Sequence, residues 1–352
     1  MSKTKPKLII IDGNALVHRS FHALPPTMRT RSGQIVNAVY GFTSFLLKAI
    51  NEFHPEYVVL TLDKKGPTFR HEEYAAYKAT RVKAPDELYE QIPLVKQVAA
   101  AFKIPIFELP GYEADDLIGT ICEQTSDNKN LEKIIITGDL DTLQLIDGQT
   151  KVYTMSRGLT DSVLYGPEQV KERYGLRPDQ IIDYKALRGD PSDNIPGVKG
   201  IGEKTASELL IEFKTLDGVY AAAQKNNPKI TARVNEKLLT NRADAYLSRK
   251  LATINRQAPL KFKLADIEFA SFDLDEVMAV FSNLEFRSLL SKVKDLRDNL
   301  NKHHEPAGET KFARNTQAFK YQLVNDEKKF RAFLKKIKLR KDFAFDTETT
   351  GL

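Results

Sequence analysis

Apolar runs alternate with helical patterns through the first half of the chain. Short, strongly apolar runs at 7–11, 57–62 and 133–137 predict three buried β-strands. Apolar positions at helical spacing predict helices over 36–53 and 86–102. Because strands that alternate with helices form parallel sheets with helices on both faces, the predicted fold class is α/β, with a parallel central sheet flanked by helices.

The pattern changes after about residue 174. Short helical patterns separated by glycine and proline replace the strand-like runs, which predicts a first domain at 1–174 and a mostly helical subdomain at 175–293. The polar, charged stretch at 294–318 is typical of a linker. The last segment, 319–352, has a strand, helix and strand pattern of its own.

A carboxylate follows each of the three predicted strands. Asp12 and Asp63 come directly after the first two, and Asp139 and Asp141 follow the third. Ligands of parallel α/β sheets bind just beyond the carboxyl ends of the strands. A single Asp in such a place is more commonly a helix cap or a turn residue, so only the recurrence points to a site.

Two further acidic clusters strengthen this interpretation. Glu113, Asp115 and Asp116 open an apolar helical stretch, and Asp190 and Asp193 lie in a tight turn. Carboxylates that are crowded together raise one another's pKa or destabilise the fold unless cations neutralise them. The predicted metal ligands are therefore Asp12, Asp63, Glu113, Asp115, Asp116, Asp139, Asp141, Asp190 and Asp193.

Oxygen donors of this kind suit magnesium or manganese. Two such ions about 3.5–4 Å apart can clamp the attacking and leaving oxygens of a phosphodiester. The single cysteine, Cys122, excludes an intramolecular disulfide and a multi-cysteine zinc site. The alternative is that the nine acids are unrelated caps and solvated side chains.

Composition limits the class of protein. The 352 residues are 41% hydrophobic, enough for roughly two globular domains. No apolar run approaches the roughly 18–20 residues of a membrane span, and the run at 8–11 is too short for a signal peptide, so we expect a cytoplasmic protein. The 53 Lys and Arg against 47 Asp and Glu give a net charge of only +6, so the placement of the charges matters more than their sum.

The segment at 64–83 is basic and aromatic. It holds six Lys or Arg residues against two Glu, and in a helix Tyr77 and Arg81 would share one face next to that of Lys78. Aromatic rings beside cations fit single-stranded nucleic acid, which needs stacking on bases and contacts to phosphates. A plain charged surface helix is the alternative.

A glycine-rich turn follows the second acidic cluster. Its three glycines allow a close backbone approach, and the helix that follows presents its N-terminal amides to an anion. This turn resembles a helix-hairpin-helix, which grips the backbone of a duplex without reading its sequence. An ordinary glycine turn would look similar. The candidate DNA contacts here are Gly197, Lys199, Gly200, Gly202, Lys204 and Thr205.

Taken together, these motifs resemble the 5′-nuclease domains of bacterial DNA polymerases I, a branch of the flap endonuclease family. The resemblance runs from about residue 8 to 292. It rests on Ile11-Asp12-Gly13, Val39-Tyr40-Gly41-Phe42, Leu62-Asp63, Phe69-Arg70, Tyr77-Lys78, Gly111-Tyr112-Glu113-Ala114-Asp115-Asp116, Thr137-Gly138-Asp139-Leu140-Asp141, Gly189-Asp190-Pro191-Ser192-Asp193-Asn194 and Gly200-Ile201-Gly202-Glu203-Lys204-Thr205.

The resemblance implies a PIN/flap-endonuclease-like fold with a helix-three-turn-helix at about 190–212. It implies that the matching carboxylates bind two divalent metal ions and that the hairpin binds potassium. A basic helical arch at about 64–85 would hold the 5′ end, with Arg19 beside it. The implied catalytic residues are Arg19, Arg70, Lys78 and Arg81, with Tyr77 and Lys83 contacting DNA. Leu140 departs from the family, where many relatives have a basic residue.

The implied activity is 5′–3′ exonuclease and flap endonuclease cleavage at a 5′ flap, a nick or an RNA primer. A polymerase would act in cis or in trans, and we expect a monomer associated with the nucleoid. Residues 343–352 resemble the first motif of a 3′–5′ proofreading exonuclease, but we expect Asp346 and Glu348 to form no working site without the later motifs. The alternatives are a non-catalytic DNA-end binding module, a 3′–5′ proofreading exonuclease and a single-strand ribonuclease.

Overall fold

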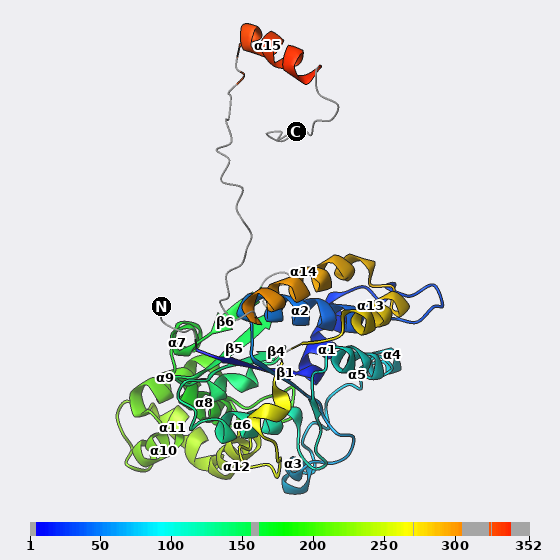
Figure 1. Cartoon of the computed structure of the whole chain (residues 1–352). Helices are drawn as coiled ribbons and strands as arrows, with labels where there is room; N and C mark the ends of the chain where they lie inside the picture. The colour runs from blue at the N-terminus through cyan, green and yellow to red at the C-terminus, as the bar shows by residue number, and fades with distance from the viewer. Residues whose placement is uncertain (1–4, 156–161, 270, 305–323, 325, 339–352) are drawn as a thin grey trace. The chain divides into compact units, whose positions relative to one another are not determined.

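The computed structural model describes residues 5–155, 162–269, 271–304, 324 and 326–338. The chain divides into two units, Met1–His304 and Glu305–Leu352, which are described separately. The first unit is built on a six-stranded sheet of order β3-β2-β1-β4-β5-β6 (Figure 1). The strands are β1 (Lys7–Asp12), β2 (Tyr57–Thr61), β3 (Ile106–Phe107), β4 (Glu132–Thr137), β5 (Thr150–Met155) and β6 (Ser162–Tyr165).

The sheet is mixed, because β6 runs antiparallel to β5 while the other neighbours are parallel. The three strands that the apolar runs predict are present as β1, β2 and β4, and the antiparallel edge is an addition to the predicted parallel sheet. From β1 the chain builds outward through β2 and β3 and then returns to place β4 on the other side of β1. This reversal of strand order is where α/β sheets bind ligands.

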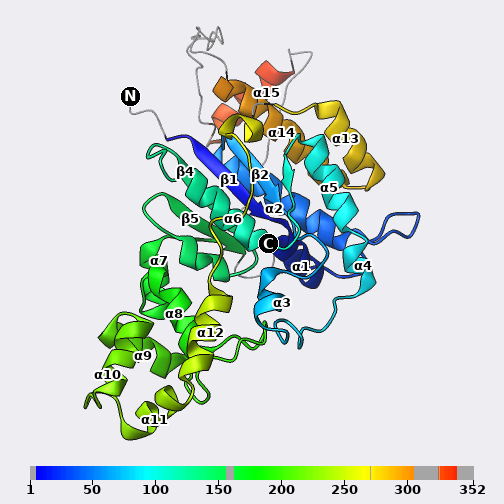
Figure 2. The same cartoon turned by 90° about the horizontal axis from the view of Figure 1, so that it is seen from below.

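Helices cover both faces of the sheet, which explains why the central strand β1 is apolar on both faces. Ile9 and Ile11 of β1 face a core that includes α2 (Asn37–Phe53), and Leu8 and Ile10 face the opposite core under α6 (Ala114–Gln124). Figure 2 shows α6 lying across the face opposite to α2. The helix predicted over 36–53 is therefore confirmed as α2.

The helix predicted over 86–102 is broken into α4 (Asp86–Tyr89) and α5 (Ile92–Ala101). Pro93 has no N–H to continue a helical ladder and lies in the first turn of α5, where that loss costs nothing. At the break, the Gln91 side-chain oxygen accepts from the backbone N–H groups of Ala38 (2.8 Å) and Val39 (3.2 Å). The interruption thus supplies an acceptor for the start of α2.

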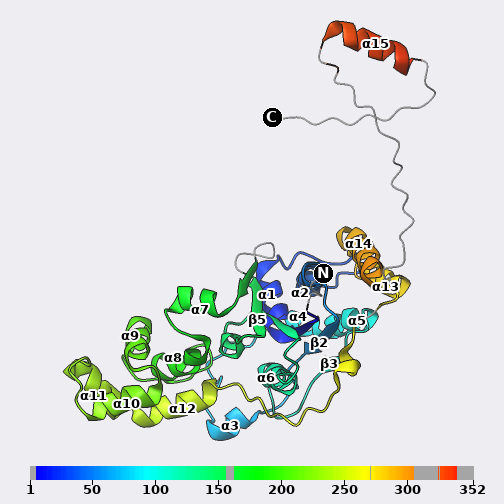
Figure 3. The same ribbon diagram turned by 60° about the vertical axis from the view of Figure 1, so that its left-hand side comes forward.

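The predicted helical part is confirmed: the described residues 175–269 contain no named strand. These helices have a core of their own and lie together at one end of the sheet (Figure 3). They are α8 (Ile181–Arg188), α9 (Glu203–Phe213), α10 (Leu216–Gln224), α11 (Ala232–Thr240) and α12 (Arg242–Ala252). The preceding helix, α7 (Pro167–Tyr174), buries Val170 in the core under the sheet. No helix within the described ranges is long and apolar enough to cross a membrane.

The linker predicted at 294–318 overlaps a helix. After α13 (Leu274–Asn283), the helix α14 runs from Arg287 to His304 and packs against α2 (Figure 1). Its inner face consists of buried leucine and valine side chains at helical spacing, namely Leu289, Val293, Leu296 and Leu300. This stretch is therefore an amphipathic helix, although most of its residues are polar.

In the second unit, α15 (Glu327–Ile337) lies within the helix predicted for the last segment. The strands predicted on either side of it fall outside the described residues, apart from Val324. Asp346 and Glu348 of the predicted exonuclease-like motif also lie outside them.

We expect Leu296→Ala to lower the free energy of unfolding by roughly 2–5 kcal/mol, because it removes a buried side chain from the core that α14 shares with α2. Lys294→Ala, at an exposed position on the same helix, should change it by less than about 0.5 kcal/mol. Urea unfolding followed by circular dichroism measures both. Equal, small effects would mean that α14 does not pack here in solution.

Candidate active site

A cavity of about 680 Å³ lies at the carboxyl ends of β1, β2 and β4. Seven of the nine predicted acids line it: Asp12, Asp63, Glu113, Asp115, Asp139, Asp141 and Asp193. Arg19, Lys78 and Arg81 line the same cavity. The structure therefore brings these side chains together from segments as far apart as Asp12 and Asp193, whereas Asp116 and Asp190 do not line the cavity.

Asp12 is both a helix cap and part of the acidic cavity. It precedes α1 (Gly13–Ala23), and its Oδ1 accepts from the Ala15 N–H at 3.0 Å. Its Oδ2 accepts from the Thr137 hydroxyl at 2.6 Å, which fixes the carboxylate between β1 and β4. Burial, together with the charges of Asp139 and Asp63, raises the pKa of Asp12 to about 7.

Three further carboxylates share this environment. Asp63 Oδ1 accepts from the N–H of Ala114, the first residue of α6, at 2.7 Å. Burial, and then the charges of Asp12, Asp139 and Asp141, hold the pKa of Asp115 well above its usual range. Within the described residues, no ion pair reaches Asp12, Asp63, Asp115 or Asp139. We call these four the open carboxylates.

Asp116 is paired with Arg70 instead. The two guanidinium Nη atoms donate to the two Asp116 oxygens, each at 2.8 Å, and both side chains are buried. The same carboxylate also accepts from the N–H groups of Glu113 (3.0 Å) and Asn255 (2.8 Å). The structure thus places Asp116 away from the cavity, as the partner of a buried cation.

Arg70 is predicted to contact phosphate, but the structure gives its guanidinium a full set of protein acceptors. It lies in α3 (Phe69–Glu73) and also donates to the carbonyls of Leu251 and Thr253, both at 2.9 Å. With Glu113 at 3.4 Å, every N–H direction of the fork is used. Arg70 therefore joins α3, α6 and the C-terminal end of α12.

The helix predicted for this segment is short. α3 ends at Glu73, and residues 75–80 form turns. Tyr77 is buried, and its hydroxyl donates to Glu113 Oε2 (3.1 Å) and Asp193 Oδ2 (3.2 Å), so its ring is not free to stack on a base. Buried carboxylates are stable only with hydrogen-bond donors, and residues 77–81 supply donors to Glu113 and Asp193. The helical geometry predicted for the arch is corrected accordingly.

Lys78 and Arg81 supply charge to the same two acids. Lys78 has a left-handed backbone (φ +57°), and its Nζ lies 2.6 Å from Glu113 Oε1. Arg81 Nη2 lies 2.6 Å from Asp193 Oδ1, and half of the Arg81 side chain remains exposed. Although burial opposes the ionisation of Glu113, the Lys78 and Arg70 cations hold its pKa below the ordinary value.

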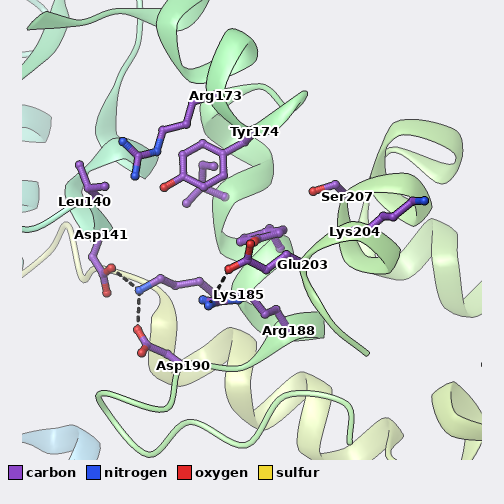
Figure 4. A pocket seen from close by; sticks show the side chains of 12 residues that line it. Leu140, Asp141, Arg173, Tyr174, Lys185, Arg188, Asp190, Glu203, Lys204 and Ser207 are labelled. Carbon is purple, nitrogen blue, oxygen red and sulfur yellow. Dashed lines mark hydrogen bonds and ion pairs between the residues drawn. The ribbon is translucent and has the colours of Figure 1, made fainter. Parts of the chain in front are cut away.

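Sequence reasoning missed Lys185. On α8, its Nζ contacts Asp141 Oδ1 and lies 2.7 Å from Asp190 Oδ2, as Figure 4 shows. Lys185 and the Ser192 donors overcome burial and lower the pKa of Asp190 to about 2. The available signal was the position of Lys185 four residues after Ile181, on the buried face of α8, where a lysine is unexpected.

Asp190 and Asp193 lie in a tight turn between Gly189 and Gly197, just before the glycine-rich turn. Gly189 (φ +79°) and Gly197 (φ +63°) pack so closely that a Cβ at Gly197 would lie 2.3 Å from the Gly189 nitrogen. Asp190 and Ile195 exchange two backbone hydrogen bonds, of 2.9 and 2.8 Å. Glycine is therefore required at both positions for the acids to reach the sheet.

The remaining predicted nucleic-acid contacts are mostly exposed to solvent. Lys199, Gly200, Gly202 and Lys204 are exposed at the turn and the start of α9, and Thr205 is half-buried. Lys237 from α11 donates to the Gly200 carbonyl at 2.7 Å. Lys83 is exposed and pairs with Asp86 at 2.5 Å, and Arg19 is an exposed side chain of α1.

The donor chemistry fits hard divalent cations, since the cavity offers carboxylate oxygens. In the described part of the chain, no three His, Cys, Asp or Glu side chains are already placed to enclose a metal ion. Magnesium keeps several waters and is commonly held by one or two carboxylates, so an incomplete protein cage is compatible with it. The open carboxylates are the side chains most suited to hold such an ion.

Comparisons with known proteins agree with this architecture. Residues 7–175 match the family described as "5′-3′ exonuclease, N-terminal resolvase-like domain", and 176–275 match "5′-3′ exonuclease, C-terminal SAM fold". DNA polymerase I of Caldicellulosiruptor bescii is 44% identical over 289 residues, which are 82% of this chain and 33% of that protein. DNA polymerase I of Bacillus caldotenax is 43% identical over 290 residues, 82% of this chain and 32% of that protein. The chain thus spans about a third of the length of these relatives.

Solved structures of low sequence identity share the fold. A zinc-bound T5 5′-exonuclease superposes with a TM-score of 0.56 at 19% identity, covering 84% of this chain and 98% of that one. The catalytic core of Rad2 in complex with DNA substrate superposes with a TM-score of 0.54 at 19% identity, covering 84% and 93%.

Replacing Asp116 should destabilise the protein. Asp116→Asn leaves the Arg70 cation buried without its bidentate partner, at an expected cost of about 3–5 kcal/mol in the free energy of unfolding. Asp139→Asn is the matched variant: it relieves repulsion among acids and should leave stability equal or higher in EDTA. Urea unfolding of both measures the difference. A similar loss in both variants would contradict the division into paired and open carboxylates.

Asp12, Asp63 and Asp115, whose pKa values are raised in the folded state, should make the protein less stable as pH rises. Because the pKa of Asp12 is about 7 when folded and 3.8 is its ordinary value, the folded state binds more protons between about pH 4 and 7. The free energy of unfolding in EDTA should therefore fall across this window as pH increases. Asp12→Asn should reduce that slope, as measured by urea unfolding at several pH values. An unchanged slope would show that Asp12 titrates normally.

Proposed function

The chain belongs to the 5′-3′ exonuclease family, and we propose that it hydrolyses phosphodiester bonds near the 5′ end of a nucleic-acid strand with two divalent cations, magnesium or manganese. The observation that carries this proposal is the single cavity in which open carboxylates stand beside Arg19, Lys78 and Arg81. Acids without cationic partners attract metal ions, and neighbouring basic side chains attract phosphate.

The side chains divide the chemical work. Divalent ions in such a site lower the pKa of water and neutralise charge on the phosphate. Asp12, held by Thr137 and Ala15, supplies a rigid ligand at the end of β1. Arg81, half-exposed, and Lys78 donate to the phosphate and offset the negative charge that develops as the bond breaks.

We propose that the substrate is a duplex with a 5′ flap, a nick or an RNA primer. The exposed Lys199 and Lys204 at the glycine turn can contact the phosphates of a duplex while its 5′ strand enters the cavity. Potassium is the proposed ion at the turn, where backbone carbonyls are available. Tyr77 acts in this scheme by holding Glu113 and Asp193, and Lys83 contributes charge at the rim.

The wider setting of the activity is also a proposal. The relatives named DNA polymerase I are about three times longer than the matched region, so a polymerase would act in cis or in trans with this nuclease. We propose a monomer that works on DNA in the bacterial cytoplasm, at the nucleoid.

The test is cleavage of a 5′-flap duplex by the full chain. We expect 5′-labelled fragments to appear with magnesium and not with EDTA. Asp139→Ala, which removes an open carboxylate, should lower the rate by at least about 100-fold while flap binding in calcium persists.

Lys151→Ala, at a lysine paired with Glu132 away from the cavity, is the matched control and should cleave normally. Loss of label from the 3′ end only would support a 3′–5′ exonuclease instead. Binding without any cleavage would support a non-catalytic end-binding module.

A further inference from the structure

We propose that the ammonium group of Lys185 occupies a cation position of the acidic centre and has to leave it before a divalent ion can bind between Asp141 and Asp190. The two divalent ions would then bind with unequal affinity, the first at the open carboxylates and the second in competition with Lys185. This inference rests on the proposed function and names a regulation of the same site.

The geometry of the three side chains supports this role. The Lys185 ammonium touches Asp141, just beyond β4, and Asp190, in the turn after α8, so it joins two segments that are distant in sequence. Its side chain is only 11% exposed, and the two carboxylates are 23% and 13% exposed. A single cation between two largely buried carboxylates has the position that a bridging metal ion would take.

The charges in the centre are unevenly compensated. Glu113 and Asp193 are paired with Lys78 and Arg81, and Asp141 and Asp190 share Lys185, whereas the open carboxylates have no ion pair within the described ranges. A first divalent ion at the open carboxylates therefore displaces no protein cation. A second ion at Asp141 and Asp190 has to break two contacts of an ammonium group that is otherwise well satisfied.

The structure also provides a place for the displaced side chain. A second cavity of about 650 Å³ lies on the Lys185 side, and it shares Leu140 and Asp141 with the first cavity. Figure 4 shows Lys185 reaching along one wall of this space, with Arg188 and Glu203 paired nearby at 2.8 Å. The flexible four-carbon stem can rotate into this space while α8 stays in place.

The test is a titration of the full chain with Mn²⁺ in the absence of nucleic acid, followed by electron paramagnetic resonance and calorimetry. The wild-type protein should bind one ion tightly and a second weakly. Lys185→Met should bind the second ion at least roughly tenfold more tightly, a difference of about 1.4 kcal/mol, because no ammonium group has to be displaced, and it should leave the first ion unchanged. Lys185→Arg, which keeps the charge, should retain the weak second site.

Equal second-ion affinity in wild type and Lys185→Met would overturn the proposal. If Lys185→Met fails to fold, Lys185→Gln keeps hydrogen-bond donors without the charge and carries the same expectation. Lys151→Met is the control and should bind both ions as wild type does. Cleavage of a 5′-flap duplex is measured separately: absent cleavage with altered ion affinity refutes the proposed function alone, and normal cleavage with unaltered affinity refutes this inference alone.

Discussion

Electrostatic repulsion among carboxylates at the carboxyl edge of one parallel sheet is the constraint on which the rest of the structure depends. The fold gathers these acids from five regions of the chain and must compensate their charge. It does so in part with its own cations, Arg70, Lys78, Arg81 and Lys185. The open carboxylates are what remains, and burial together with the neighbouring acids raises the pKa values of Asp12, Asp63 and Asp115.

The same compensation holds the parts of the first unit together. Arg70 connects α3 to α6 and to the last turn of α12, and Tyr77 joins Glu113 to Asp193 in the tight turn before the glycine-rich turn. The paired acids thus serve the architecture, while the open ones are left for chemistry. Because both kinds lie in one cluster, a substitution that abolishes activity has to be checked for stability before a residue is given a catalytic role.

Membership of the family and the geometry of the cavity contribute different things. The family matches cover residues 7–275, and the structural likeness at 19% identity reaches the fold alone. The distinction between a ligand and a structural partner comes from the contacts of this chain. Lys185 illustrates it, since its role depends on where its ammonium lies between Asp141 and Asp190.

The sequence by itself determined β1, β2, β4, α2 and the acids that follow the strands, because apolar periodicity and strand ends are local properties. It also indicated the glycine turn. Only the tertiary structure decided which acid receives a cation: Arg70 and Asp116 are 46 residues apart, and Arg81 and Asp193 are 112 apart. Such pairs leave no periodic signal in the sequence. The end of α3 at Glu73 leaves none either, because the residues after it contact the buried carboxylates Glu113 and Asp193, which are distant in sequence.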